Sequence, residues 1–274
     1  MLTAAAAILA SLTGSLGPAG HAVSVPGYSW ADGPSSWLAA PGCLVRAEVW
    51  EAEVSGGIGG EDPAREWSEE GSARLCAAGP AGPVYAGAGA TAGLGAADTL
   101  AAEAAGAWLV TGDPISFMEG FFGPSVSVGA ALGARTISAN GERSGELYAS
   151  ASGQVALFPT FCIGVGTHSA RLAEWGSGDL LSGDAGRDVS ASCTYIFGRR
   201  LRGHLGFGAG GPSVGADLRV SDHLTVIAGT DGGHWSAGAR GSYGRLGLHY
   251  SLRLTETGAV HAGGVSMKLG ETSW

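Results

Sequence analysis

Eight basic side chains from residue 135 onward share one face of a strand-like alternation. They are Arg135, His168, Arg202, His204, Arg219, Arg240, His249 and Arg253. Imidazole and guanidinium groups can transfer protons, bind anions or hold paired charges in a polar interior. Because Ser and Asp residues are also plentiful, the first chemistry to consider is nucleophilic catalysis by a hydroxyl, an imidazole and a carboxylate.

The motifs that would support catalysis or cofactor binding are weak. The sequence contains no His-Glu-x-x-His element and no two His residues four positions apart. The acidic residues between Glu48 and Glu70 lack the alternating oxygen spacing of a calcium loop, and they predict a solvated loop. The glycine-rich GFGAGG at 206–211 has no strand–helix context for a dinucleotide. We therefore predict no catalytic residue, no metal and no cofactor, and we assign the eight basic residues to a polar lumen.

Period-two alternation is the strongest physical signal in the chain, and it defines the elements that position these basic residues. In residues 245–253, Leu246, Leu248, Tyr250 and Leu252 alternate with Arg245, His249 and Arg253. Similar alternation recurs at 125–135, 146–157, 161–168, 188–197, 201–207, 213–220 and 235–243. Such runs predict strands with one apolar and one polar face.

Turn signals separate these predicted strands. Asn140-Gly141, Asp222-His223, 231–233 and 256–258 are typical of short hairpin connections. Weaker strand candidates lie at 44–54, 73–78 and 83–94, so that about 12–14 strands are expected. The Ala-rich segment 96–109 is ambiguous: it fits a short helix, which could be a plug, or a poorly paired strand.

Composition distinguishes a membrane barrel from a soluble sheet. Only 14% of residues are charged, against roughly 25% in soluble proteins. The polar faces of the predicted strands carry mainly Ser, Gly, Thr, Arg and His. This composition is unsuited to the solvent-exposed surface of a soluble sandwich or lipocalin-like barrel, but it suits the lining of a lumen. The fold class predicted is all-β: an antiparallel transmembrane β-barrel in contact with outer-membrane lipid. A soluble exported sheet is the alternative, and the net charge of −9 argues against a nucleic-acid partner.

Aromatic residues and the N-terminus agree with an exported barrel. Tyr195, Trp235, Tyr243 and Tyr250 share the apolar face, and several lie near predicted strand ends, where an aromatic girdle is expected. Residues 1–22 resemble a signal peptide, with an apolar run too short to span a bilayer and small residues after it.

The four cysteines show no metal-binding spacing. Cys162 shares parity with the polar face of its predicted strand, whereas Cys193 shares parity with the apolar face of its own. These two thiols are therefore expected on opposite faces of the sheet, where they cannot easily pair. We expect most of the four cysteines to be isolated small apolar residues.

The segment ADGPSSWLAAPGCL at 31–44 resembles the element that opens the barrel in the FadL-like superfamily, which includes PorV-type, TraF-like and spirochaetal barrels. Asp32, Pro34, Ser35, Pro41 and Leu44 match its Asp-Asp-Pro-Ser…Asn-Pro-Ala-Gly-Leu pattern, while Ala40, Gly42 and Cys43 replace the family's Asn, Ala and Gly. The closing hairpins from about residue 216 to 270 are similar to the family's as well. The resemblance implies a barrel over 45–270 with residues 23–44 inside it as an N-terminal plug.

Two functions follow from that resemblance. The first is passage of hydrophobic small molecules across the outer membrane, as in FadL-type proteins. The second is docking or assembly with a secretion machinery, as in PorV-type proteins, where Trp175 or the acidic 55–75 segment would offer the contact surface. The short predicted turns favour passage.

Overall fold

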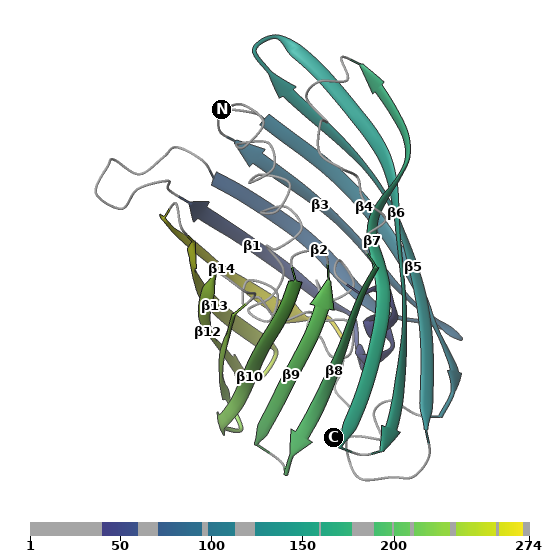
Figure 1. The fold of residues 1–274 in the computed structure, drawn as a ribbon, viewed down its shortest axis with the longest axis vertical. Helices are drawn as coiled ribbons and strands as arrows, with labels where there is room; N and C mark the ends of the chain where they lie inside the picture. The colour runs from purple at the N-terminus through teal and green to yellow at the C-terminus, as the bar shows by residue number, and fades with distance from the viewer. Residues whose placement is uncertain are drawn as a thin grey trace.

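A computed structural model describes residues 40–59, 71–94, 98–112, 124–158, 160–176, 189–198, 200–208, 211–230, 234–255 and 258–270. In this part of the chain, fourteen antiparallel strands pair in sequence order, and the first pairs with the last to close a barrel (Figure 1). The predicted signal peptide and residues 23–39 of the predicted plug lie outside the described residues. Of the residues described, none forms a helix long and apolar enough to cross a membrane.

A short 3₁₀ helix precedes the strands. The elements are η2 (Pro41–Arg46), β1 (Glu51–Gly59), β2 (Gly71–Ala81), β3 (Val84–Leu94), β4 (Asp98–Thr111), β5 (Ser125–Ala139), β6 (Glu142–Phe158), β7 (Phe161–Gly176), β8 (Val189–Phe197), β9 (Leu201–Gly208), β10 (Gly211–Ser221), β11 (Leu224–Thr230), β12 (Trp235–Tyr243), β13 (Leu246–Thr255) and β14 (Gly258–Lys268). The meander of strands predicted from Pro124 onward is confirmed. The fourteen strands of the barrel are the upper limit of the 12–14 expected from the sequence.

The two faces of the sheet are oriented as the alternation predicts. Leu248 is 61% exposed on the outer face, whereas Ser251 on the same strand is 1% exposed on the inner face. The same contrast runs around the barrel, with apolar side chains outside and Ser, Thr, Glu, Arg and His inside. Closure satisfies the backbone groups that an open sheet edge would leave unpaired in lipid. The fold is therefore that of a transmembrane β-barrel, which places the protein in the outer membrane.

Local chemistry explains the tightest turn and the aromatic positions. Asn140 (φ 52°) and Gly141 (φ 80°) both adopt the left-handed conformation that a two-residue hairpin between β5 and β6 requires. Trp235 and Tyr243 are the first and last residues of β12, and both are exposed on the outer face. Aromatic side chains at strand ends are typical of the membrane–water boundary.

The structure decides one open alternative and corrects the bounds of one candidate strand. Residues 98–111 form β4, so that the strand alternative for the Ala-rich segment is correct and the helix is not. Residues 99–107 of this segment pair with β3 on one side and with β5 on the other, and these backbone hydrogen bonds outweigh the helix propensity of Ala. The candidate strand at 44–54 begins only at Glu51, because Leu44 and Val45 belong to η2 inside the barrel.

The barrel has one tall wall and one short wall. Strands β5, β6 and β7 contain 15, 17 and 16 residues, whereas β9 and β11 contain 8 and 7. Figure 1 shows the tall strands extending beyond their neighbours. β7 pairs with β6 as far as Gly176, but its described pairing with β8 ends at Thr167. The β6–β7 register also shifts at Leu147/Tyr148 and Ala149/Ala151, which marks β-bulges.

The 3₁₀ helix η2 lies against the inner face of the tall wall. The Gly42 amide donates to Ser152 Oγ at 2.8 Å, and Ser127 Oγ donates to the Gly42 carbonyl at 3.2 Å. Gly129 of β5 permits this approach, because a Cβ there would lie 2.5 Å from the Gly42 nitrogen. Thus Pro41 and Leu44, two of the five family-motif positions, are inside the barrel, while Asp32, Pro34 and Ser35 lie outside the described residues.

The cysteines occupy the faces that parity predicts. Cys162 is fully buried on the inner face of β7, whereas Cys193 belongs to β8 and pairs with the outward-facing Ile163. None of the four cysteines, all of which lie in the described part of the chain, forms a disulfide.

Candidate functional site in the barrel lumen

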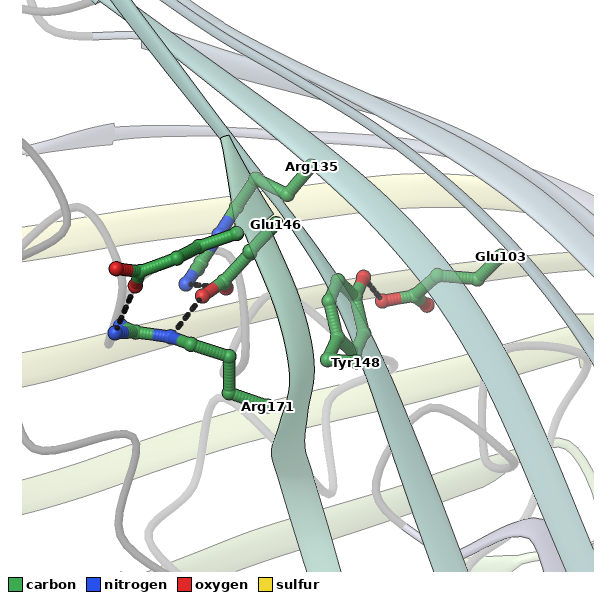
Figure 2. Close-up of polar contacts among 6 residues, drawn as sticks. Glu103, Arg135, Glu146, Tyr148 and Arg171 are labelled. Atoms are coloured by element: carbon green, nitrogen blue, oxygen red, sulfur yellow. Dashed lines mark hydrogen bonds and ion pairs between the residues drawn. The ribbon is translucent and has the colours of Figure 1, made fainter. Parts of the chain in front are cut away.

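An aromatic residue and a carboxylate meet on the inner face of the tall wall. The Tyr148 hydroxyl of β6 donates a hydrogen bond to Glu103 of β4, reaching across β5 (Figure 2). Gly133 of β5 lies beneath the Tyr148 ring, since a Cβ at Gly133 would be 2.5 Å from Tyr148 Cζ. The glycine therefore makes the cross-strand contact possible.

Alternating charges continue this row across β5, β6 and β7. Arg135 and Arg171 both bind Glu146, whose side chain is 2% exposed, and the Arg171 Nε to Glu146 Oε2 distance is 2.9 Å (Figure 2). Arg171 also contacts Glu174 at 2.8 Å. The buried Glu146 is thus paired with two arginines, as a buried charge requires, while Glu174 is 52% exposed at the end of the row.

A second row follows β1, β2 and β3. Arg74 of β2 is 4% exposed, and its Nε donates to Thr91 Oγ1 of β3 at 3.0 Å. It also interacts electrostatically with Glu103 and with Glu53 of β1. Glu53 is 1% exposed, so that it belongs to the lumen rather than to the solvated acidic loop that the sequence predicts. The inward parity of Glu53 on β1 places its carboxylate there.

On the short wall, a hydroxyl, an imidazole and a carboxylate form a continuous hydrogen-bonded row. Thr194 Oγ1 lies 2.9 Å from His204 Nδ1, and His204 Nε2 lies 2.8 Å from Asp217 Oδ2. Arg202 Nε donates to the other Asp217 oxygen at 2.7 Å. The order resembles a catalytic triad, but Thr194 is 0% exposed and a nucleophile must reach its substrate. The row acts instead as a fully satisfied polar network that connects β8, β9 and β10.

A formal nucleophile motif on β10 has the wrong structural context. Residues 211–215 read Gly-Pro-Ser-Val-Gly, which matches the Gly-x-Ser-x-Gly pattern. That pattern is catalytic when its serine occupies a sharp strand-to-helix turn. Ser213 instead lies within β10, which pairs with β9 and β11.

Basic residues gather on the inner face of β12 and β13. Arg240 of β12 pairs in register with His249 of β13, and the two side chains interact electrostatically. His249 leans over Gly264 of β14, and its Nε2 lies 3.9 Å from Glu53 Oε1. Further along the same strands, Arg253 Nη2 lies 3.4 Å from His234 Nδ1.

The predicted lumen residues therefore do not form one site. Arg135 belongs to the tall-wall row, Arg202 and His204 to the Asp217 network, and Arg240, His249 and Arg253 to the β12–β13 face. Arg219 is 53% exposed near the end of β10 and pairs with Asp222 at 3.3 Å, which places it at the barrel rim. The side chain of His168, beside a bulge in β7, lies outside the described part of the structure.

Sequence reasoning missed several lumen residues, each for an identifiable reason. They are Glu53, Arg74, Glu103, Glu146, Tyr148 and Arg171. Between residues 101 and 107 of β4 the positions around Glu103 are Ala or Gly on both faces, so the inward parity of Glu103 carries little signal. In β7 the bulges change the parity, so that Arg171 points inward despite the simple alternation. Glu146 stands on the predicted polar face, and acidic residues there should have been considered with the basic ones.

An apolar patch interrupts the polar lumen beside η2. Leu44 and Val45 pack against small side chains from β2, β4 and β5, with Tyr85 and Leu109 at the edge. The buried small residues are Cys76, Ala78, Ala107 and Ala131. Hydrogen bonds hold η2 on the neighbouring β5–β6 wall, where Arg46 Nη2 donates to Gln154 Oε1 at 3.3 Å.

Comparison with solved structures gives the same architecture over nearly the whole chain. The CymD monoaromatic hydrocarbon channel is similar with a TM-score of 0.69 and 11% identity, over 94% of this chain and 98% of that chain. The Ralstonia pickettii toluene transporter TbuX has a TM-score of 0.63 and 10% identity, over 93% and 98%. A Pseudomonas aeruginosa FadL homologue has a TM-score of 0.56 and 9% identity, over 90% and 96%. Neither a family model nor a curated protein matches the sequence.

These likenesses, together with the closed barrel and the 3₁₀ helix η2 inside it, define the class of fold: a FadL-like outer-membrane β-barrel. The FadL-like resemblance read from the 31–44 segment and the closing hairpins is thus confirmed at the level of fold.

Proposed function

We propose that this protein is an outer-membrane channel through which hydrophobic small molecules pass. The observation that carries the proposal is the apolar lumen patch beneath η2, set in an otherwise polar interior. Leu44 and Val45 cover this patch of small side chains. An apolar molecule about as large as these two side chains would find a matching contact area there. Two of the similar structures are a monoaromatic hydrocarbon channel and a toluene transporter, which supports this substrate class.

The upper part of β7 supports a sideways exit from the lumen. Beyond Thr167, the described residues of β7 pair with β6 but not with β8. Leu172, 57% exposed, lies on this part of the strand. An apolar molecule that leaves between strands reaches lipid directly and avoids the charged rows.

The docking alternative has less support. Trp175, one of the two surfaces considered for it, packs over Gly145 on the neighbouring strand, where a Cβ would lie 2.3 Å from its ring. Residues 60–70 of the other surface lie outside the described part of the chain.

Uptake of radiolabelled toluene tests the proposal. Gram-negative cells without an endogenous aromatic channel would express the full chain, and its insertion would be checked by the heat-dependent gel shift of a folded barrel. We expect initial uptake to exceed that of vector-only cells severalfold at low toluene concentration. Equal rates in both strains, with the barrel correctly inserted, would refute the proposed function.

A further inference from the structure

Three successive turns at one end of the short wall each carry a basic residue. They are Arg200 in the β8–β9 turn, His223 in the β10–β11 turn and Arg245 in the β12–β13 turn, and all three are exposed. These turns lie at the same end of the barrel, because β8, β10 and β12 end there and their partners begin there. In Figure 1 this end of β8, β9 and β10 is at the bottom.

Backbone hydrogen bonds place two more basic residues at the same end. The Arg219 amide donates to the Arg200 carbonyl at 2.7 Å, and the Lys268 amide donates to the Arg245 carbonyl at 2.9 Å. Each of these two pairs therefore consists of like charges on neighbouring strands. The group that results is called the basic rim, and its members are Arg200, Arg219, His223, Arg245 and Lys268.

Most of the charge of the basic rim is not cancelled by the protein. Asp222 pairs with Arg219 at 3.3 Å. Among the described residues, however, Arg200, Arg245 and Lys268 form no ion pair with a carboxylate. Like charges on adjacent strands repel each other, so that an anion bound between Arg245 and Lys268 would stabilise this edge of the sheet.

The basic rim borders the lipid-facing surface directly. Tyr243 and Leu246, on either side of the β12–β13 turn, are 82% and 54% exposed on the outer face. Met267 and Leu269, on either side of Lys268, are exposed as well. An aromatic residue at the end of a barrel strand is typical of the membrane–water boundary. The unpaired charges therefore lie at the level of the lipid headgroups.

The connections indicate which side of the membrane the basic rim faces. Outer-membrane barrels have short periplasmic turns and longer extracellular loops. Apart from the β4–β5 connection, every connection at the end of the basic rim has two or three residues, whereas the connections 60–70 and 177–188 are at the other end. The basic rim accordingly faces the periplasmic leaflet, which consists of phospholipids.

We propose that the basic rim binds the headgroups of anionic phospholipids in the periplasmic leaflet. Arg200 and Arg245 can contact a phosphate with two parallel N–H donors, and Lys268 contributes a compact charge. The acyl chains of the same lipids would lie along the apolar outer face of β8–β14. This binding is independent of what passes through the lumen, because the basic rim is separate from the apolar patch beside η2.

Native mass spectrometry of the full-length barrel, released from non-ionic detergent, tests the proposal. The protein is mixed with equal amounts of phosphatidylglycerol and phosphatidylcholine, which share a phosphate but differ in net charge. We expect bound phosphatidylglycerol to exceed phosphatidylcholine about fivefold, because one basic side chain at a membrane surface attracts an anionic lipid by roughly that factor. Higher ammonium acetate should reduce the preference by screening. Equal binding of the two lipids would refute the proposal.

Variants test whether the basic rim is responsible. The triple variant Arg200→Gln, Arg245→Gln, Lys268→Gln should bind the two lipids equally, whereas Arg200→Lys with Arg245→Lys should keep the preference because the charges remain. If the triple variant lacks the heat-dependent gel shift of a folded barrel, Arg245→Gln alone should still lower the preference. Its matched control is Arg143→Gln, which removes an exposed arginine of β6 at the other end of the barrel. An equal loss in these two single variants would contradict the assignment.

Two further probes distinguish a lipid from other anionic partners. Excess inorganic phosphate at constant ionic strength should leave the phosphatidylglycerol preference unchanged, since phosphate lacks the acyl chains that the outer face contacts. Loss of the preference would show a site for free anions and overturn the lipid assignment. Binding of poly-glutamate without any preference for phosphatidylglycerol would also overturn it, in favour of an acidic protein partner.

Discussion

Tyr148 lies directly over Gly133, and its hydroxyl thereby reaches Glu103 two strands away. The contact joins β4, β5 and β6 on the inner face of the tall wall, next to the Arg135–Glu146–Arg171 row. The guanidinium carbon of Arg135 lies 6.0 Å from the centre of the Tyr148 ring, so the aromatic and charged parts of the wall are in contact. Gly133, which has no side chain, therefore leaves the space that this part of the polar lumen requires.

Replacing Gly133 by Ala should displace the Tyr148 ring and break its hydrogen bond to Glu103. The expected loss is about 1–3 kcal/mol in the free energy of unfolding, from overpacking and the loss of the hydrogen bond to the partly buried Glu103 carboxylate. Urea unfolding in lipid vesicles, followed by tryptophan fluorescence, measures it. Gly153→Ala serves as the control, because the atom nearest to a Cβ there is 3.7 Å away. Equal stability of the two variants would show that Tyr148 is not held over Gly133.

Replacing Gly129 by Ala should detach η2 from the wall of the barrel. A Cβ at this position would lie 2.5 Å from the Gly42 nitrogen and 2.5 Å from the Pro41 carbonyl carbon, and backbone atoms cannot move aside as a flexible side chain can. Maleimide labelling, with the modified cysteine identified by mass spectrometry, should increase severalfold at Cys43 and Cys162, which are 1% and 0% exposed in the intact barrel. Gly106→Ala on β4, whose Cβ would meet nothing closer than 3.9 Å, should label as the unmodified protein does.

Removing Asp217 should destabilise the short wall. Asp217→Ala leaves Arg202 and His204 without their shared carboxylate inside the lumen, at an expected cost of about 2–3 kcal/mol in the free energy of unfolding. Asp222→Ala removes the same kind of side chain where it is 90% exposed, and it should have no measurable effect. Urea midpoints of the two variants in the same vesicles provide the comparison. Matching midpoints would mean that the Asp217 network does not stabilise the fold.

Bulk at the upper part of β7 should slow hydrophobic uptake. Leu172→Trp adds a large ring at the strand edge beyond Thr167, where the described residues of β8 provide no partner. Leu75→Trp is its counterpart on β2, where Leu75 is 58% exposed against 57% for Leu172 and pairs with strands on both sides. We expect toluene uptake to fall severalfold in the first variant and to stay unchanged in the second. A sideways exit at β7 is excluded if both variants transport equally.

The sequence by itself determined the faces of the strands and the nature of the sheet. Alternation is a local, period-two property, so Leu248 outward and His249 inward follow from neighbours in the chain alone. The Asn140-Gly141 turn is equally local, because those two residue types tolerate the positive φ that the hairpin needs. Few charges and many small polar residues then selected a membrane barrel over a soluble one.

Only the tertiary structure decided which side chains meet inside the barrel. The Tyr148–Glu103 bond depends on the registers of two strand pairs, the inward position of Arg171 depends on bulges in β7, and the pairing of β1 with β14 joins the two ends of the described chain. These contacts connect residues far apart in sequence, so they form only when the strands of the sheet come together. The same holds for η2, whose seat on Gly129 is a fit between two backbones that no local pattern encodes.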